Sequence, residues 1–151
     1  MTDEAWQRIL DINLNGVFWS CRAFGKRMVE RQQGAIVTVG SMSGFISNKP
    51  QKQVNYNSSK AAVHHLTRSL AGEWADRDVR VNSVAPTYVN TPISNITAKD
   101  SQYFDVWMQG TPMRRMIEPG EVAAAILFLA SHAASAITGA ILPVDAGYTI
   151  W

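Results

Sequence analysis

The chain has 151 residues, of which 46% are apolar and 17% are charged, and its formal net charge is +2. These values are typical of one globular domain and exclude disorder over most of the chain. A small net charge made of both signs gives no support to nucleic-acid binding, so we expect no nucleic-acid partner.

The sequence also argues against a membrane protein, a secreted protein and a metalloprotein. The longest apolar runs, such as residues 123–130, are far shorter than the roughly 20 residues of a membrane span. The start, Met1-Thr2-Asp3-Glu4, lacks the layout of a signal peptide. Cys21 is the only cysteine, which excludes an internal disulfide and a thiolate zinc cluster. We therefore expect a cytoplasmic protein with no membrane contact and no metal site.

Helix and strand patterns alternate along the chain. Thr2 is a candidate N-cap, and Gly34 is expected to end the helix that follows it. In chain order, the apolar spacing predicts a helix over residues 2–32, a strand over 35–39, a loop over 41–54, a helix over 56–75, a strand over 79–85, a polar segment over 87–119 with a short helix near 101–109, a helix over 121–132 and a strand over 140–144. This alternation predicts an α/β fold with a parallel sheet and helices on its faces.

Two segments are candidates for a functional site. Ligands of parallel α/β folds bind at the carboxyl ends of the strands, which directs attention to residues 40–56 and 86–91. Tyr56 and Lys60 are four residues apart and therefore share a helix face. A nearby cation stabilises a phenolate, and such a phenol can exchange a proton with a carbonyl or an alcohol, with Ser41 bonding the same substrate oxygen. Alone, the Tyr-x-x-x-Lys spacing is more often that of a solvated pair on an amphipathic helix.

Five motifs occur in one order along the chain. They are Asn13-Leu14-Asn15-Gly16, Gly40-Ser41-Met42-Ser43-Gly44, Asn55-Tyr56-Asn57-Ser58-Ser59-Lys60, Arg80-Val81-Asn82-Ser83-Val84-Ala85-Pro86 and Leu142-Pro143-Val144-Asp145-Ala146-Gly147. With them the sequence strongly resembles the short-chain dehydrogenase/reductase family over essentially all 151 residues. The resemblance implies a Rossmann-like fold and a hydride transfer between a nicotinamide cofactor and a substrate carbon.

The resemblance also implies catalytic roles for the matching positions. Ser41 would orient and polarise the substrate carbonyl, with Ser43 as a competing choice, and Tyr56 would be the catalytic acid/base. Lys60 would lower the pKa of the tyrosine and hydrogen-bond the nicotinamide ribose. Asn13 would hold a water molecule that links Lys60 to solvent as a proton relay.

The cofactor, NAD(H) or NADP(H) with NAD(H) favoured, would contact Tyr56, Lys60, Pro86, Val89 and Thr91. One departure lies here: the proline is followed by threonine where the family usually has glycine, so the backbone approaches the cofactor less freely.

A larger departure concerns the phosphates. No two glycines are two apart, so the G-x-G-x-x-G turn that seats the pyrophosphate is absent from this sequence. The chain thus resembles the second half of such an enzyme. We expect residues 1–151 to form a single partial domain, with the N-terminal half of the usual fold and its NAD/NADP-selecting residues missing.

The loop after the first strand bears on the substrate. Ser41, Ser43 and Asn48 are expected to bind it, and Gln51 can hydrogen-bond a polyhydroxylated one, although ordinary loop polarity explains these residues equally well. Within the family, residues 40–50 and 147–151 look most like sugar-alcohol dehydrogenases and ketose reductases. We therefore expect a small alcohol or carbonyl substrate, a polyol or ketose, and a homodimer or homotetramer. The alternative is a non-catalytic remnant or oligomerisation module that cannot bind cofactor alone.

Other chemically active side chains have simpler interpretations. His64 and His65 are adjacent on a helix and face different ways, which favours a structural or interface role over metal binding. Asp145 is interpreted as a turn residue, and Cys21 as a small core residue. Trp107 and Tyr148 are interpreted as walls of a substrate pocket or as packing.

Overall fold

The fold is built on a three-stranded parallel sheet. Its strands β1 (Gly34–Val39), β2 (Val79–Pro86) and β3 (Ile141–Val144) are hydrogen-bonded in the order β1-β2-β3 in the computed structural model, which describes residues 1–94 and 101–151. β1 pairs with β2 in register along its whole length, and the last four residues of β2 pair with β3. All three strands therefore end at the same edge of the sheet.

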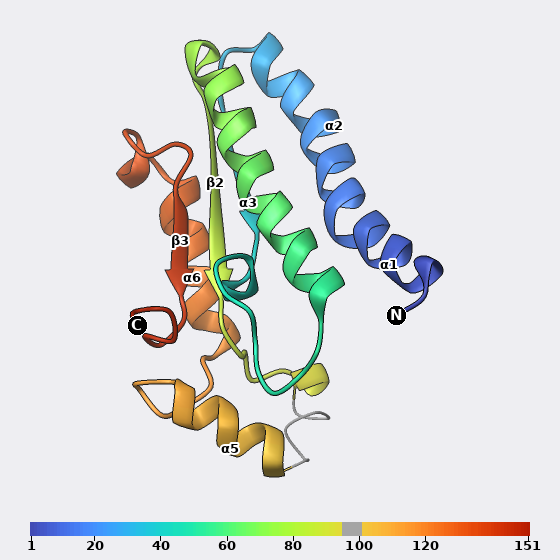
Figure 1. Cartoon of the computed structure of the whole chain (residues 1–151). Helices are drawn as coiled ribbons and strands as arrows, with labels where there is room; N and C mark the ends of the chain where they lie inside the picture. The colour runs from blue at the N-terminus through green and yellow to red at the C-terminus, as the bar shows by residue number, and fades with distance from the viewer. Residues whose placement is uncertain (95–100) are drawn as a thin grey trace.

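Helices cover both faces of this sheet (Figure 1). On one face lie α3 (Val54–Trp74) and a long rod made of α1 (Asp3–Leu10), the π-helical turn η1 (Asp11–Asn15) and α2 (Gly16–Glu30). On the other face lies α6 (Pro119–Ala130), while α5 (Ser101–Gly110) lies beyond the carboxyl ends of the strands. Short 3-10 turns are η2 (Met42–Gly44), η3 (Ala75–Arg77) and η4 (His132–Ala134). The predicted α/β fold with a parallel sheet and helices on both faces is confirmed.

At the start of the chain, the structure agrees with the predicted helix only in part. Thr2 caps α1 as predicted, because its hydroxyl accepts a 3.3 Å bond from the amide of Ala5. The helix predicted over residues 2–32 is interrupted by η1 and ends at Glu30, and Gly34 does not end it but begins β1. A Cβ on Gly34 would lie 2.6 Å from Cγ of Met28, so glycine lets the strand start directly beneath the helix.

A core cluster joins the rod to the sheet. Cys21 of α2 packs with Leu70 and Ala71 of α3 and with Val79 and Val81 of β2, and all five are buried. Cys21 is thus a core residue, as predicted. None of the helices in the described part of the chain is long and apolar enough to cross a membrane. Part of the polar segment predicted over residues 87–119 lies outside the described residues.

Candidate active site

A cavity of about 630 Å³ opens at the carboxyl ends of β1 and β2. Its walls come from the loops after both strands, the first turns of α3, and α5. The structure brings eight predicted site residues together here: Ser41, Ser43, Asn48, Tyr56, Lys60, Pro86, Val89 and Thr91. The predicted carboxyl-edge location is therefore where these side chains gather.

Ser41 is held at the end of β1 in extended backbone and is only 7% exposed. Its hydroxyl oxygen accepts a 3.1 Å hydrogen bond from the amide of Ser43, and the same side chain acts to lower the pKa of Tyr56. The competing serine, Ser43, instead accepts a 3.4 Å bond from the side-chain amide of Gln53. Of the two serines, Ser41 is thus the one whose side chain influences the pKa of the tyrosine.

Tyr56 and Lys60 project from successive turns of α3. The Lys60 ammonium lies 5.6 Å from the centre of the Tyr56 ring and donates a 2.9 Å bond to the backbone carbonyl of Val39. Burial raises the pKa of Tyr56, an effect that the hydrogen bond with Ser41 opposes, and burial lowers the pKa of Lys60. The lowering of the tyrosine pKa by Lys60, which the resemblance implies, is not seen in this geometry because burial of the phenol dominates.

Asn13 lies in the π-helical turn, an irregularity that is frequent at functional sites. Its side-chain amide donates a 3.1 Å bond to the hydroxyl of Ser59, which donates a 2.7 Å bond to the backbone carbonyl of Tyr56. Asn13 lines a neighbouring groove with Lys60 and does not line the cavity that holds Ser41. The water relay through Asn13 stays a prediction.

Amide and aromatic side chains form a further part of the cavity wall. Gln51 donates a 3.2 Å bond to the phenol oxygen of Tyr88 and accepts a 3.1 Å bond from the indole of Trp107. The rings of Tyr88 and Trp107 are stacked, with centres 4.0 Å apart and planes inclined by 11°. Burial raises the pKa of Tyr88 to about 12, so its hydroxyl keeps its proton. Trp107 was one of the predicted pocket walls, whereas Tyr88 was missed.

Gln53 is the other residue that sequence reasoning missed. Its side-chain nitrogen lies 3.1 Å from Oδ1 of Asn48 and 2.9 Å from Oδ1 of Asn57, besides its bond to Ser43. It therefore ties the loop after β1 to the first turn of α3. The available signal was its place immediately before that helix, in a stretch rich in amide side chains.

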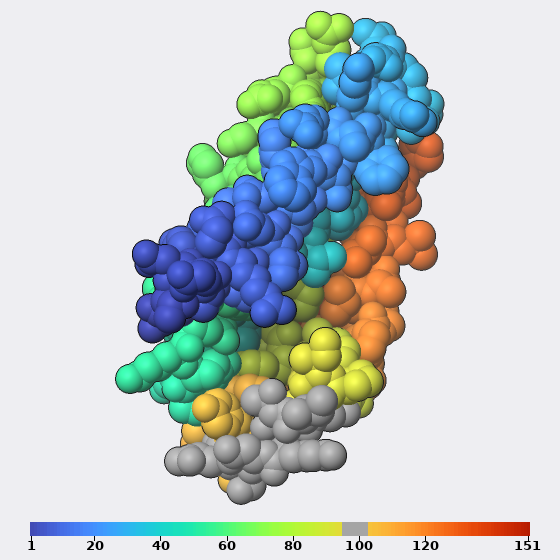
Figure 2. Space-filling view, turned by 90° about the vertical axis from the view of Figure 1, so that its right-hand side faces the viewer, coloured from blue at the N-terminus to red at the C-terminus, as the bar shows by residue number. Residues whose placement is uncertain are grey.

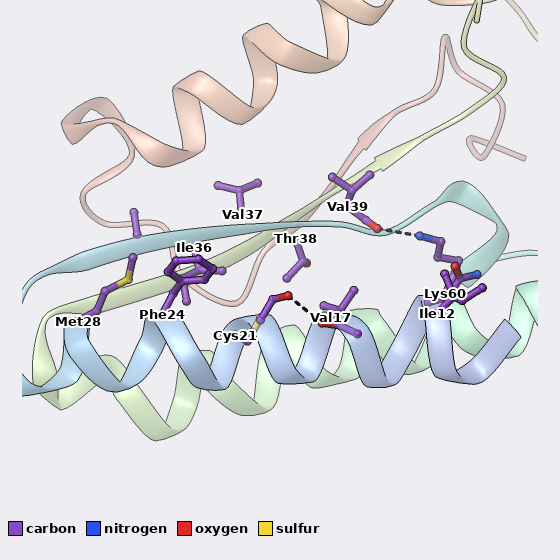
Figure 3. Close-up of a pocket in the computed structure, with 14 residues that line it drawn as sticks. Ile12, Val17, Cys21, Phe24, Met28, Ile36, Val37, Thr38, Val39 and Lys60 are labelled. Carbon is purple, nitrogen blue, oxygen red and sulfur yellow. Dashed lines mark hydrogen bonds between the residues drawn. The ribbon is translucent and has the colours of Figure 1, made fainter. Parts of the chain in front are cut away.

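A second hollow, here called the β1-edge groove, lies between α2 and β1 and has a volume of about 540 Å³. Apolar side chains such as Ile12, Val17, Phe24, Met28 and Ile36 line it (Figure 3). Within the described residues β1 pairs with β2 alone, so the other edge of β1 borders this groove. Figure 2 shows the strand region in teal between α2 in blue and α6 in orange.

Other candidate residues fit simpler roles. Asp145 closes a turn, because its carboxylate accepts bonds of 3.0 Å from the amide of Gly147 and 2.6 Å from the hydroxyl of Thr149. His65 is exposed while His64 is buried, so the two do not converge. In residues 1–94 and 101–151, no three His, Cys, Asp or Glu side chains are grouped as a metal site would need.

Comparison with known proteins places this geometry in a family. A family model described as enoyl-(acyl carrier protein) reductase matches residues 1–149. Galactitol 2-dehydrogenase of Rhizobium johnstonii is 58% identical over 151 residues, covering 100% of this chain and 59% of the relative. The NADH-dependent L-xylulose reductase of Ambrosiozyma monospora is 42% identical over 149 residues, covering 96% of this chain and 55% of the relative. A solved short-chain type dehydrogenase/reductase from Mycobacterium marinum has a TM-score of 0.93 at 43% identity, covering 99% of this chain and 58% of that one.

These matches span nearly all of this chain but less than two thirds of each relative's own length. The similarity therefore concerns the part of the fold described above, with its three parallel strands and the cavity at their carboxyl ends. The chain belongs to the short-chain dehydrogenase/reductase family.

Proposed function

We propose that this chain carries the substrate-binding and proton-transferring part of an NAD(P)-dependent oxidoreductase that interconverts a polyol and a ketose. The observation that carries the proposal is the meeting of Ser41, Tyr56 and Lys60 in one cavity. A hydroxyl, a phenol and an ammonium together can hold a carbonyl oxygen and exchange a proton with it.

Each of these side chains has a defined task in this proposal. In oxidation, Tyr56 as phenolate takes the proton of the substrate hydroxyl, the C–H bond of the same carbon breaks and a C=O bond forms. In reduction, Tyr56 returns the proton to the carbonyl oxygen. Ser41 donates a hydrogen bond to that oxygen, and the positive charge of Lys60 would act against the burial that raises the pKa of Tyr56. The nicotinamide cofactor, when bound, accepts or supplies the hydride.

The end of β2 and the residues after it fit the nicotinamide end of this cofactor. Pro86, Val89 and Thr91 line the cavity beside Tyr56. Among the described residues, the hydroxyl of Thr87 is a buried polar group without a hydrogen-bond partner. Since buried polar groups are nearly always paired, this hydroxyl suits a polar ligand group such as a carboxamide. We infer NAD(H) as the cofactor, as in the xylulose reductase relative.

The lining of the cavity favours a neutral, polyhydroxylated substrate. Lys60 is the one charged side chain among its described lining residues, whereas Asn48, Gln51, Gln53 and Tyr88 are uncharged and polar. Amides and hydroxyls both donate and accept hydrogen bonds, as the hydroxyls of a sugar alcohol do. The names of the galactitol and L-xylulose enzymes agree with this class.

The test uses the complete protein and a panel of substrates. Tyr56→Phe removes the proton carrier and is expected to lower kcat by about 10²- to 10⁴-fold. Tyr103→Phe, in α5 at the same cavity, is the matched control and is expected to keep its activity. Undiminished activity of the Tyr56 variant would refute the mechanism. Preference for acyl thioesters or steroids over galactitol and L-xylulose would refute the substrate class.

We propose as a second candidate that the 151-residue chain by itself is an association module without cofactor binding. The β1-edge groove favours it, because a strand edge that no described residue pairs, beside exposed Ile12 and Phe24, promotes self-association. Sedimentation velocity and NADH titration of the purified chain test this candidate. A monomer that binds NADH contradicts it, whereas dimers or tetramers that do not bind NADH support it.

A further inference from the structure

The loop that carries Ser41 is folded around the imidazole of His64. His64 lies in the middle of α3 and is only 3% exposed. A Cβ on Gly40 would lie 2.4 Å from its Nε2, and a Cβ on Gly44 would lie 2.5 Å from its Cε1. The two glycines of Gly40-Ser41-Met42-Ser43-Gly44 therefore lie against two edges of the same ring, in space that any other residue would fill with its side chain. The ring of Phe45 lies 4.5 Å away, centre to centre.

One polar contact joins the imidazole to the proposed catalytic serine. The backbone amide of Ser41 donates a hydrogen bond of 3.4 Å to Nε2 of His64, and both residues are buried. A nitrogen that accepts a hydrogen bond carries no proton, so this contact requires the neutral imidazole with its proton on Nδ1.

The surroundings keep the imidazole in that neutral form. Burial lowers the pKa of His64 to about 4, with further contributions from the positive charges of Arg68 and Lys60 on the same helix. The groups that face the ring from other elements are uncharged: Gly40, Gly44 and Phe45 of the loop, and Ser41. His64 therefore remains an acceptor over the neutral pH range.

We propose that His64 is a positioning residue that fixes the backbone of Ser41, so that the serine hydroxyl faces Tyr56 and the substrate oxygen. His64 touches neither substrate nor cofactor in this scheme and acts only through Ser41. The hydroxyl oxygen of Ser41 accepts a bond from the amide of Ser43, and the backbone amide of Ser41 donates a bond to His64. The effect on catalysis rests on the proposed function, whereas the hydrogen bond itself does not.

The first experiment needs no activity. Long-range ¹H–¹⁵N spectra of the full chain are expected to show Nε2 of His64 unprotonated and Nδ1 protonated from about pH 8 down to about pH 5. His64→Gln keeps an acceptor near the position of Nε2 and is expected to leave the Ser41 amide resonance hydrogen-bonded. His64→Leu removes the acceptor and is expected to shift that resonance. A protonated Nε2, or a Ser41 resonance unmoved in the leucine variant, would overturn the proposal.

The second experiment measures turnover by the complete protein. His64→Leu is expected to lower kcat by about 10- to 100-fold, as displacement of a catalytic group does, with the KM for cofactor unchanged. His64→Gln is expected to restore most of the kcat, and His65→Leu, the exposed neighbour, to retain all of it. Equal losses in the leucine and glutamine variants would show that ring volume alone matters and overturn the proposal. An inactive wild-type protein would refute the proposed function, and the spectra would still decide the role of His64.

Discussion

Gly40→Ala is the sharpest test of how the loop after β1 is held. The new Cβ would lie 2.4 Å from Nε2 and 2.6 Å from Cδ2 of His64, and 3.1 Å from the hydroxyl oxygen of Ser83. The imidazole cannot retreat, because Gly44 and Phe45 lie against it as well. Overpacking of this kind costs about 1–3 kcal/mol. Removing a glycine from the unfolded chain returns about 0.4–1 kcal/mol. We therefore expect the free energy of unfolding to fall by about 1–2 kcal/mol.

The matched control is Gly72→Ala in α3. Gly72 is exposed and a Cβ there would meet nothing within 4 Å, so alanine is expected to stabilise the helix by about 0.5–1 kcal/mol. Urea unfolding of the full chain, followed by circular dichroism, measures both variants. The midpoint should fall for Gly40→Ala and rise for Gly72→Ala. If both midpoints rise, the imidazole does not fill the space beside Gly40 and the reasoning fails.

Three further outcomes follow from the same contacts. Asn82→Leu should lower the free energy of unfolding by about 2–5 kcal/mol in urea titrations, because the carbonyl of Ile137 and the amide of Ala140 both lose their buried partner. Arg80→Met should lower the thermal midpoint, because the guanidinium donates to carbonyls at the end of α6, the shortest bond being 2.7 Å to Leu129. Alcohol oxidation by the complete protein should accelerate as pH rises toward and beyond about 10, because burial raises the pKa of Tyr56 and oxidation needs its phenolate. Carbonyl reduction, which needs the protonated phenol, should slow over the same range. An oxidation rate that does not change with pH would contradict the role of Tyr56.

Much of the fold follows from patterns that need only neighbouring residues. The β-branched residues 36–39 and the valines at 79, 81 and 84 identify β1 and β2, because buried strands select such side chains. The predicted helix over 56–75 agrees with α3 to within two residues. The predicted meeting of Ser41 with Tyr56 also needs only the topology, since parallel strands end at one edge.

Features that depend on contacts between residues far apart in the sequence could not be predicted from those patterns. The sequence of residues 11–15 does not predict a π-helical turn. The structure shows that Asn13 in this turn is hydrogen-bonded to Ser59 of α3, a contact between residues far apart in the sequence. His64 and His65 carry the same side chain, but His64 is buried and His65 is exposed. The difference arises because the helix face that bears His64 packs against the loop after β1. Helical spacing offered part of this answer, because His64 lies four residues after Lys60 and three before buried Thr67.

The hydrogen bond between Lys60 and Val39 connects α3 to the end of β1 at the candidate active site. An ammonium has three donors, and the 2.9 Å bond to the carbonyl of Val39 uses one of them. In the proposed function the other two donors would serve a ribose hydroxyl of the cofactor and the oxygen of Tyr56. Because Val39 directly precedes the Gly40–Ser41 turn, the same contact links the position of the lysine to that of the serine. The ammonium of Lys60 and the proposed hydrogen-bond donor to the substrate are therefore both anchored at the end of β1, although Lys60, like Tyr56, belongs to α3.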